Sequence, residues 1–162
     1  MRVLKSPSPH ASVAAPKVFL AGSIEMGAAE DWQTALTAAL GDLDLAVLNP
    51  RRDDWDSSWR PSIDEPRFRT QVEWELDGLA AADLVAMWFA PDTRAPITLL
   101  ELGLTARSGT LVVGCPSGYW RRGNVEVVCA RFGVPLFEHW AAFVEAVRAR
   151  AVALCSGAHV AT

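Results

Sequence analysis

Hydrophobic positions follow two kinds of pattern that alternate along the chain. Short apolar runs rich in β-branched residues indicate strands, and between them apolar residues recur at the spacing of helices. Such alternation is typical of βαβ units around a parallel sheet. The expected strands are 17–21, 45–49, 83–89, 110–115 and 134–138, and the expected helices lie at about 32–40, 65–81, 97–108, 120–132 and 140–154.

Right-handed crossovers between these strands predict an α/β fold, a three-layer sandwich with a five-stranded parallel sheet. A chain of 162 residues with 51% apolar content fits one such domain. Residues 1–16 are rich in Pro, Ser and Ala without periodicity, so we expect a flexible N-terminal tail. The expected domain spans 17–155, and 156–162 form a C-terminal tail.

Composition narrows the possible partners. The chain has 15 basic and 19 acidic side chains and a net charge of -4, without a basic block, which argues against binding a nucleic acid polymer. No apolar run reaches the roughly 18 residues of a membrane helix, so we expect a cytoplasmic protein that does not bind membranes. Cys115, Cys129 and Cys155 lack CxxC spacing and are expected to be reduced thiols. No metal site and no cofactor are predicted.

The most polar and aromatic segments lie where ligands bind in this class of fold. Parallel α/β sheets bind ligands at the carboxyl ends of their strands, where the strand order reverses. Four loops are expected at that edge: 22–27, 49–64, 90–96 and 115–122.

Glu101 is an acidic residue with apolar neighbours on both sides in the sequence. In "LLELGL" (99–104) it stands within an apolar run, about one turn into the helix that follows the third expected strand. Buried glutamates are rare unless they are paired or functional. We therefore expect Glu101 to face the mouth of the site as an ionised nucleophile, favoured by the helix N-terminus. The alternative is a residue that only complements the helix dipole.

A second acidic candidate, Glu75, lies on the helix expected at 65–81. Helical geometry places Glu75 and Gln71 at the border of an apolar stripe and turns Trp74 largely away from it. Glu75 is either part of the site or a half-exposed boundary residue. The predicted stripe consists of Phe68, Val72, Leu76 and Leu79.

The turn "GSIEMG" (22–27) joins a strand to a helix, and its amides could bind an anion or a sugar hydroxyl. It lacks the residues of a Walker loop and the spacing of a dinucleotide fingerprint. Glu25 would repel a phosphate, which favours a neutral ligand. Arg51 and Arg52 could reverse this by pairing with a phosphate, or they could pair with the nearby aspartates of "NPRRDDWD".

Five segments resemble, in order and spacing, the nucleoside 2-deoxyribosyltransferase-like family over roughly residues 17–137. They are "VFLAGSIEMG", "LNPRRDDWD", "QVEWELDGLAAADLVAMWF", "PITLLELGL" and "GYWRRGNVEVVC". The resemblance implies a flavodoxin-like, Rossmann-like fold. It also implies that Glu101 is the nucleophile attacking the anomeric carbon, that Glu75 helps to hold the sugar or base, and that Asn124 reaches the nucleophile of a neighbouring subunit.

Further contacts are expected from the same resemblance. Gly22 and Ser23 would contact the sugar, and Asn49, Gln71 and Phe19 would complete the substrate-binding residues. The sequence departs from the family pattern in two places. "TRAPIT" lacks an acidic residue that contacts the base, and a phenylalanine stands at position 19 where a tyrosine is expected.

These observations predict an enzyme that cleaves the N-glycosidic bond of a 2'-deoxyribonucleoside and transfers the sugar to another base through a covalent ester. An N-glycosidase that hydrolyses a nucleoside or nucleoside 5'-monophosphate is the alternative within the same chemistry. A non-catalytic nucleoside or nucleotide sensor is the alternative of another class. We also expect a homodimer or higher homo-oligomer, because Asn124 would complete a neighbour's site.

Overall fold

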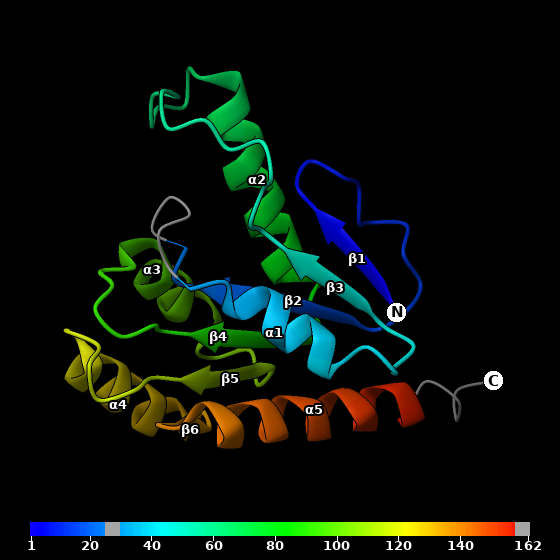
Figure 1. Ribbon diagram of the computed structural model, residues 1–162, viewed down its shortest axis with the longest axis vertical. Coiled ribbons are helices and arrows are strands. Elements are labelled where there is room, and N and C mark those ends of the chain that lie inside the picture. The colour runs from blue at the N-terminus through cyan, green and yellow to red at the C-terminus, as the bar shows by residue number, and fades with distance from the viewer. Residues whose placement is uncertain (25–29, 158–162) are drawn as a thin grey trace.

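The structure is a computed structural model, and it describes residues 1–24 and 30–157. Strands and helices alternate along the described chain as the pattern predicts (Figure 1). The strands are β1 (Arg2–Lys5), β2 (Lys17–Gly22), β3 (Ala46–Asn49), β4 (Leu84–Trp88), β5 (Leu111–Gly114) and β6 (Leu136–Phe137). The helices are α1 (Trp32–Ala39), α2 (Pro66–Ala81), α3 (Pro96–Thr105), α4 (Arg122–Phe132) and α5 (Trp140–Gly157).

The strands form one parallel sheet in the order β1-β3-β2-β4-β5-β6. Its last five strands follow the 2-1-3-4-5 order of flavodoxin-like folds. Because all the strands run in the same direction, their carboxyl ends share one edge of the sheet. The chain changes direction across the sheet between β2 and β4, so this point of the edge is where such folds bind ligands.

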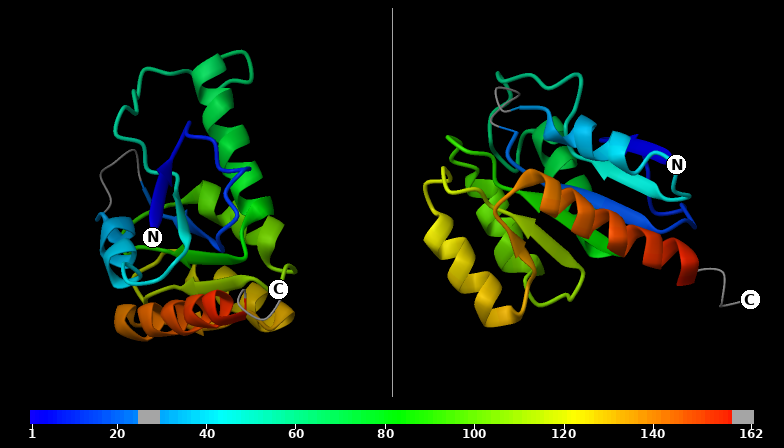
Figure 2. Two further views of the ribbon diagram at one scale, coloured as in Figure 1. Left: turned by 90° about the vertical axis from the view of Figure 1, so that its right-hand side faces the viewer. Right: turned by 60° about the horizontal axis from the view of Figure 1, so that its bottom comes forward.

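Helices cover both faces of the sheet, as Figures 1 and 2 show. Successive strand side chains point to opposite faces, so β2 contributes Phe19 to the core beneath α2, α3 and α4, and Leu20 to the core beneath α1 and α5. The three-layer α/β architecture with a parallel sheet is therefore confirmed. None of the described helices is long and apolar enough to cross a lipid bilayer.

The sheet has six strands, and the prediction of five is wrong. The additional strand, β1, comes from the segment expected to be a flexible tail, and it pairs in parallel with β3 from Arg2↔Ala46 to Lys5↔Asn49. Its four residues are too few to show periodicity. The other end also differs, because α5 continues to Gly157 and so includes the first two residues of the expected C-terminal tail.

Helix α2 buries a different face from the one predicted. Trp74 is only 7% exposed whereas Leu76 is 46% exposed. The N-terminal segment covers Trp74, and it was expected to be flexible, so the sequence pattern could not anticipate this contact. Gly78 lies on the same face and packs against the Phe19 ring, so closely that a Cβ there would come 2.8 Å from it. The buried residues of α2 are Gln71, Trp74, Gly78 and Leu79.

Candidate functional site

Gln71 and Glu75 lie one turn apart on α2 and are joined by a hydrogen bond. The Gln71 Nε2 atom donates to Glu75 Oε1 at 2.7 Å and to the backbone carbonyl of Pro50 at 3.0 Å. Both partners are acceptors, so the amide group must present its nitrogen to them. The Gln71 Oε1 atom is then left buried without a hydrogen-bond partner among the described residues. Gln71 thus links Glu75 to the loop that follows β3.

Glu101 lies on α3 and is 7% exposed. Among the described residues, none donates a hydrogen bond to its carboxylate or forms an ion pair with it. Burial, and to a lesser extent the nearby negative charge of Glu75, together raise the pKa of Glu101 to about 8. The expectation of an ionised Glu101 is therefore wrong for the free protein. Glu101 is the sixth residue of α3, where the dipole no longer offsets desolvation.

Glu75 and Glu101 form a coupled pair of carboxyl groups from different helices. Burial raises the pKa of Glu75 as well, while the hydrogen bond from Gln71 lowers it. Two carboxyl groups that repel one another in a poorly solvated place ionise one at a time, so the pair passes through a state that holds one proton.

The loop before α3 is held in an unusual conformation. Two of its residues other than glycine have left-handed backbone angles, Asp92 with φ 58° and Ala95 with φ 40°. The Tyr119 hydroxyl and the Trp120 Nε1 atom both donate hydrogen bonds to the carbonyl of Arg94. These contacts set the start of the helix that carries Glu101.

Ser23 is fully buried, and its polar groups are engaged within the protein. Its hydroxyl accepts a hydrogen bond from the Ala90 amide at 3.1 Å and bonds to the Thr93 hydroxyl at 2.7 Å. Its backbone carbonyl accepts from Trp32 Nε1 at 3.0 Å. Ser23 therefore ties the end of β2 to the loop after β4, which does not favour the predicted sugar contact for its hydroxyl.

Gly22, the other expected sugar contact, ends β2 with a φ of 152°, which few residues with a side chain adopt. A Cβ at this position would collide with the Trp88 carbonyl and the Trp32 ring. Glycine is therefore needed for the close approach of β2 and β4. Glu25, which follows in the same turn, lies outside the described residues.

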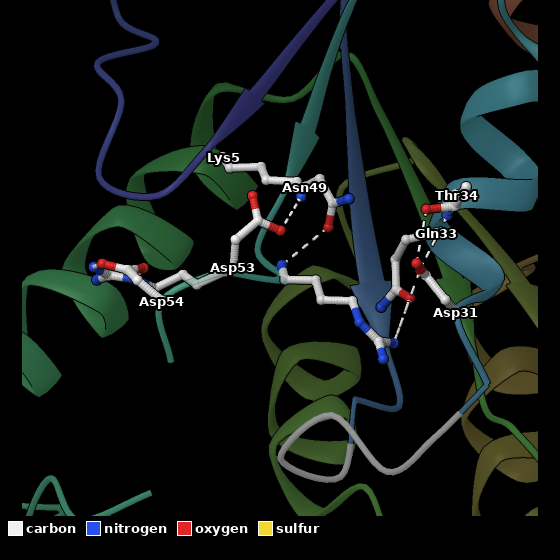
Figure 3. Close-up of polar contacts among 9 residues, drawn as sticks. Lys5, Asp31, Gln33, Thr34, Asn49, Asp53 and Asp54 are labelled. Atoms are coloured by element: carbon white, nitrogen blue, oxygen red, sulfur yellow. Dashed lines mark hydrogen bonds and ion pairs between the residues drawn. The ribbon is translucent and has the colours of Figure 1, made fainter. Parts of the chain in front are cut away.

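Asn49 ends β3, and its Oδ1 atom accepts a hydrogen bond from the Arg51 amide at 2.9 Å (Figure 3). The guanidinium of Arg51 donates to Gln33 Oε1 at 3.4 Å and lies 3.9 Å from a carboxylate oxygen of Asp31. The segment after β3 is thereby linked to α1. The sequence analysis did not select Gln33, because nothing in the pattern of α1 distinguishes a buried glutamine from an exposed one.

Arg52 makes two hydrogen bonds of 2.8 Å to Asp54. This is the predicted pairing with a nearby aspartate, which was the alternative to phosphate binding. Phe19 is fully buried in the core beneath α2, where it packs against Trp74 and Gly78. The structure thus assigns Phe19 to packing and corrects its prediction as a substrate contact.

Asn124 is exposed on α4 and lines a cavity of about 320 Å³ between α3 and α4. Glu101 does not line this cavity, so one chain alone does not bring the two residues together there. A larger cavity of about 750 Å³ lies at the amino ends of the strands, far from the carboxyl edge. Glu101 does not line that cavity either. Within residues 1–24 and 30–157, no three His, Cys, Asp or Glu side chains form a group that could hold a metal ion.

Comparisons with known proteins agree with the sequence motifs. The sequence model of a family described as "Nucleoside 2-deoxyribosyltransferase like" matches residues 15–119, which confirms the resemblance and covers more than half of the chain. The match includes Glu75 and Glu101 and ends before Asn124. The search of curated proteins found no match.

A crystal structure of a conserved protein from Enterococcus faecalis V583 has a similar fold. It superimposes with a TM-score of 0.60 at 13% identity, over 85% of this chain and 99% of that chain. At this identity the likeness supports the fold alone.

Proposed function

Because the chain belongs to the nucleoside 2-deoxyribosyltransferase-like family, we propose that it cleaves the N-glycosidic bond of a 2'-deoxyribonucleoside and transfers the sugar to another base. The observation that carries this proposal is the coupled carboxyl pair, Glu75 and Glu101, on the helices α2 and α3. A pair that holds one proton can present a nucleophile and an acid together.

The reaction proceeds as two displacements at C1' of the sugar. The proton first passes from Glu101 to Glu75. Ionised Glu101 then attacks C1' and the C1'–N bond breaks, so the electron pair of that bond leaves with the base, which takes the proton from Glu75. A nitrogen of the incoming base then attacks C1' and displaces the Glu101 carboxylate, while the proton of that base returns to Glu75. Two inversions retain the configuration at C1'.

Mass spectrometry of the protein quenched during turnover tests this mechanism. Wild-type protein mixed with a deoxynucleoside should gain the mass of one deoxyribosyl group, and Glu101→Gln should gain none. Free base labelled with an isotope should enter the product nucleoside. An adduct of equal yield in Glu101→Gln contradicts the assignment of the nucleophile.

Hydrolysis of a nucleoside 5'-monophosphate is a second candidate, favoured by Arg51. Its backbone amide donates a hydrogen bond to Asn49 in the loop after β3, and its guanidinium lies 3.9 Å from a carboxylate oxygen of Asp31. A 5'-phosphate could replace that carboxylate. Accumulation of sugar phosphate without incorporation of labelled base would select hydrolysis over transfer. Binding of nucleosides without any turnover would instead select the sensor.

A homodimer that uses α3 and α4 is part of the proposal. Large apolar side chains are exposed on both helices, and a soluble protein normally covers such a group of residues in an interface. A neighbouring subunit at this surface could bring its Asn124 toward Glu101. Light scattering measures the oligomeric state directly, and a monomer would exclude this arrangement. The exposed apolar residues are Ile97, Leu100 and Leu104 of α3 and Val127 and Phe132 of α4, with Trp120 just before α4.

A further inference from the structure

The N-terminal segment (residues 2–10) contacts α2 beside Glu75. After β1 the chain passes along α2, as the left view of Figure 2 shows, and the Ser8 carbonyl accepts a hydrogen bond from Trp74 Nε1 at 2.8 Å. The His10 ring packs edge-on against Trp74 with centroids 5.2 Å apart. The N-terminal segment precedes the residues that match the family, so the family likeness does not account for it.

Trp74 is held by contacts with two different parts of the chain. His10 of the N-terminal segment packs against its ring, and Phe19 of β2 also lies against it with ring centroids 6.2 Å apart. Both His10 and Trp74 are less than 10% exposed. Because Trp74 immediately precedes Glu75, fixing the indole ring fixes the rotation and the position of α2 at the carboxyl group of the site.

The N-terminal segment also fixes the loop to which Gln71 connects. Lys5 pairs in register with Asn49 of β3, and its ammonium group lies 2.5 Å from Asp53. Pro50, which accepts the hydrogen bond from Gln71, lies between these two attachments. The N-terminal segment therefore holds both ends of the link that runs from Pro50 through Gln71 to Glu75.

We infer that the N-terminal segment is a positioning element of the site, which holds Glu75 in place relative to Glu101 through Trp74. Its effect on catalysis rests on the proposed function, whereas its effect on α2 does not. Trp74 is a positioning residue, since its side chain contacts Ser8, His10 and Phe19 and acts on the site only through the helix.

Two substitutions in the full chain test the inference. Leu4→Asp places a charge where Leu4 packs against the core, and Trp74→Phe removes the hydrogen bond to Ser8 while keeping an aromatic ring. Leu4→Asp should lower kcat about tenfold or more, because small displacements of a reacting group are costly, and should change KM less than about twofold. Trp74→Phe should give a smaller loss in the same direction.

A double-mutant cycle separates positioning from a general loss of stability. In a Glu75→Gln background the same substitutions should have no further effect on kcat, because the carboxyl group that they displace is already absent. An equal loss in both backgrounds overturns the inference. Arg148→Met is the matched control, since it breaks an ion pair with Asp42 between α5 and the turn after α1, and it should leave kcat unchanged.

Hydrogen exchange gives a measurement that does not depend on turnover. Leu4→Asp should raise exchange of the α2 amides from 71 to 79 about tenfold, with no change in α5, and Arg148→Met should leave α2 unchanged. If the wild type cleaves no nucleoside, the proposed function fails while this measurement still decides the inference. Unchanged hydrogen exchange in α2 would overturn the inference that the N-terminal segment positions this helix.

Discussion

Glu75 and Glu101 come from different helices, and burial raises the pKa of both carboxyl groups. The position of Glu101 could be predicted from the sequence, because a glutamate within an apolar helix stands out. Its protonation could not be predicted, since it depends on burial by the whole fold and on Glu75, which is far away in the sequence. The hydrogen bond from Gln71 to the Pro50 carbonyl could not be predicted either, because it joins residues that are distant in the sequence.

The first prediction concerns the pH dependence of the reaction. Glu75→Gln removes a negative charge that raises the pKa of Glu101, so the pKa of Glu101 should fall, although burial still holds it above the usual range. The ascending limb of kcat/KM against pH should move to lower pH, with a lower maximum because the proton donor is lost. Glu73→Gln, on the exposed face of α2, should leave the limb in place. A limb that stays fixed or moves to higher pH contradicts the coupling.

The second prediction concerns stability. The folded pKa of Glu101, about 8, lies above its ordinary value of 4.5, so between these pH values the native state keeps a proton that the unfolded state has lost. The free energy of unfolding should therefore fall as the pH rises from about 4.5 to about 8. Glu101→Gln should remove much of this slope and be more stable than wild type at pH 8, by on the order of a few kcal/mol. Urea unfolding at pH 5 and pH 8 measures the free energy of unfolding of both proteins. An equal change between the two pH values in wild type and in Glu101→Gln would refute the prediction.

At the scale of elements, Ser23 joins two loops of the site. Ser23→Ala would leave the buried Ala90 amide without its acceptor, which should cost about 2 kcal/mol in the free energy of unfolding. We expect kcat to fall, because the loop before α3 loosens, with KM nearly unchanged. Urea unfolding and steady-state kinetics are the measurements. Ser156→Ala, at an exposed position of α5, is the control. A rise in KM without loss of stability would restore the sugar contact predicted from the resemblance.

Most elements could be predicted because their periodicity is local. Each strand from β2 to β6 and each helix has its counterpart among the expected ranges. The exception, β1, has only Val3 and Leu4 as apolar residues and is a strand because β3 offers it a free edge. The segment that continues from β1 buries Trp74, so missing this strand also turned the predicted buried face of α2 away from the observed one, although Leu79 belongs to both.

For the whole molecule, the proposed dimer gives a test in which two inactive proteins restore activity. If Asn124 acts on the neighbour's Glu101, a mixture of Glu101→Gln and Asn124→Ala chains forms hybrid dimers with one intact site. Mixed after mild dissociation, the two variants should recover about a quarter of wild-type activity, because half of the dimers are hybrids and each has one working site of two. Activity no greater than the sum of the separate variants would place both residues in the same chain.

The parallel sheet also determines at which edge of the molecule a bead or a carrier protein would be attached. Met1 precedes β1 at the amino edge, and Gly157, the last described residue of α5, lines the cavity at that same edge with residues that precede β2, β4 and β5. A tether joined before β1 or directly after Gly157 would therefore leave from the side opposite Glu75 and Glu101. Immobilised on a bead or fused to a carrier, the protein should keep its reactive edge turned toward the solution.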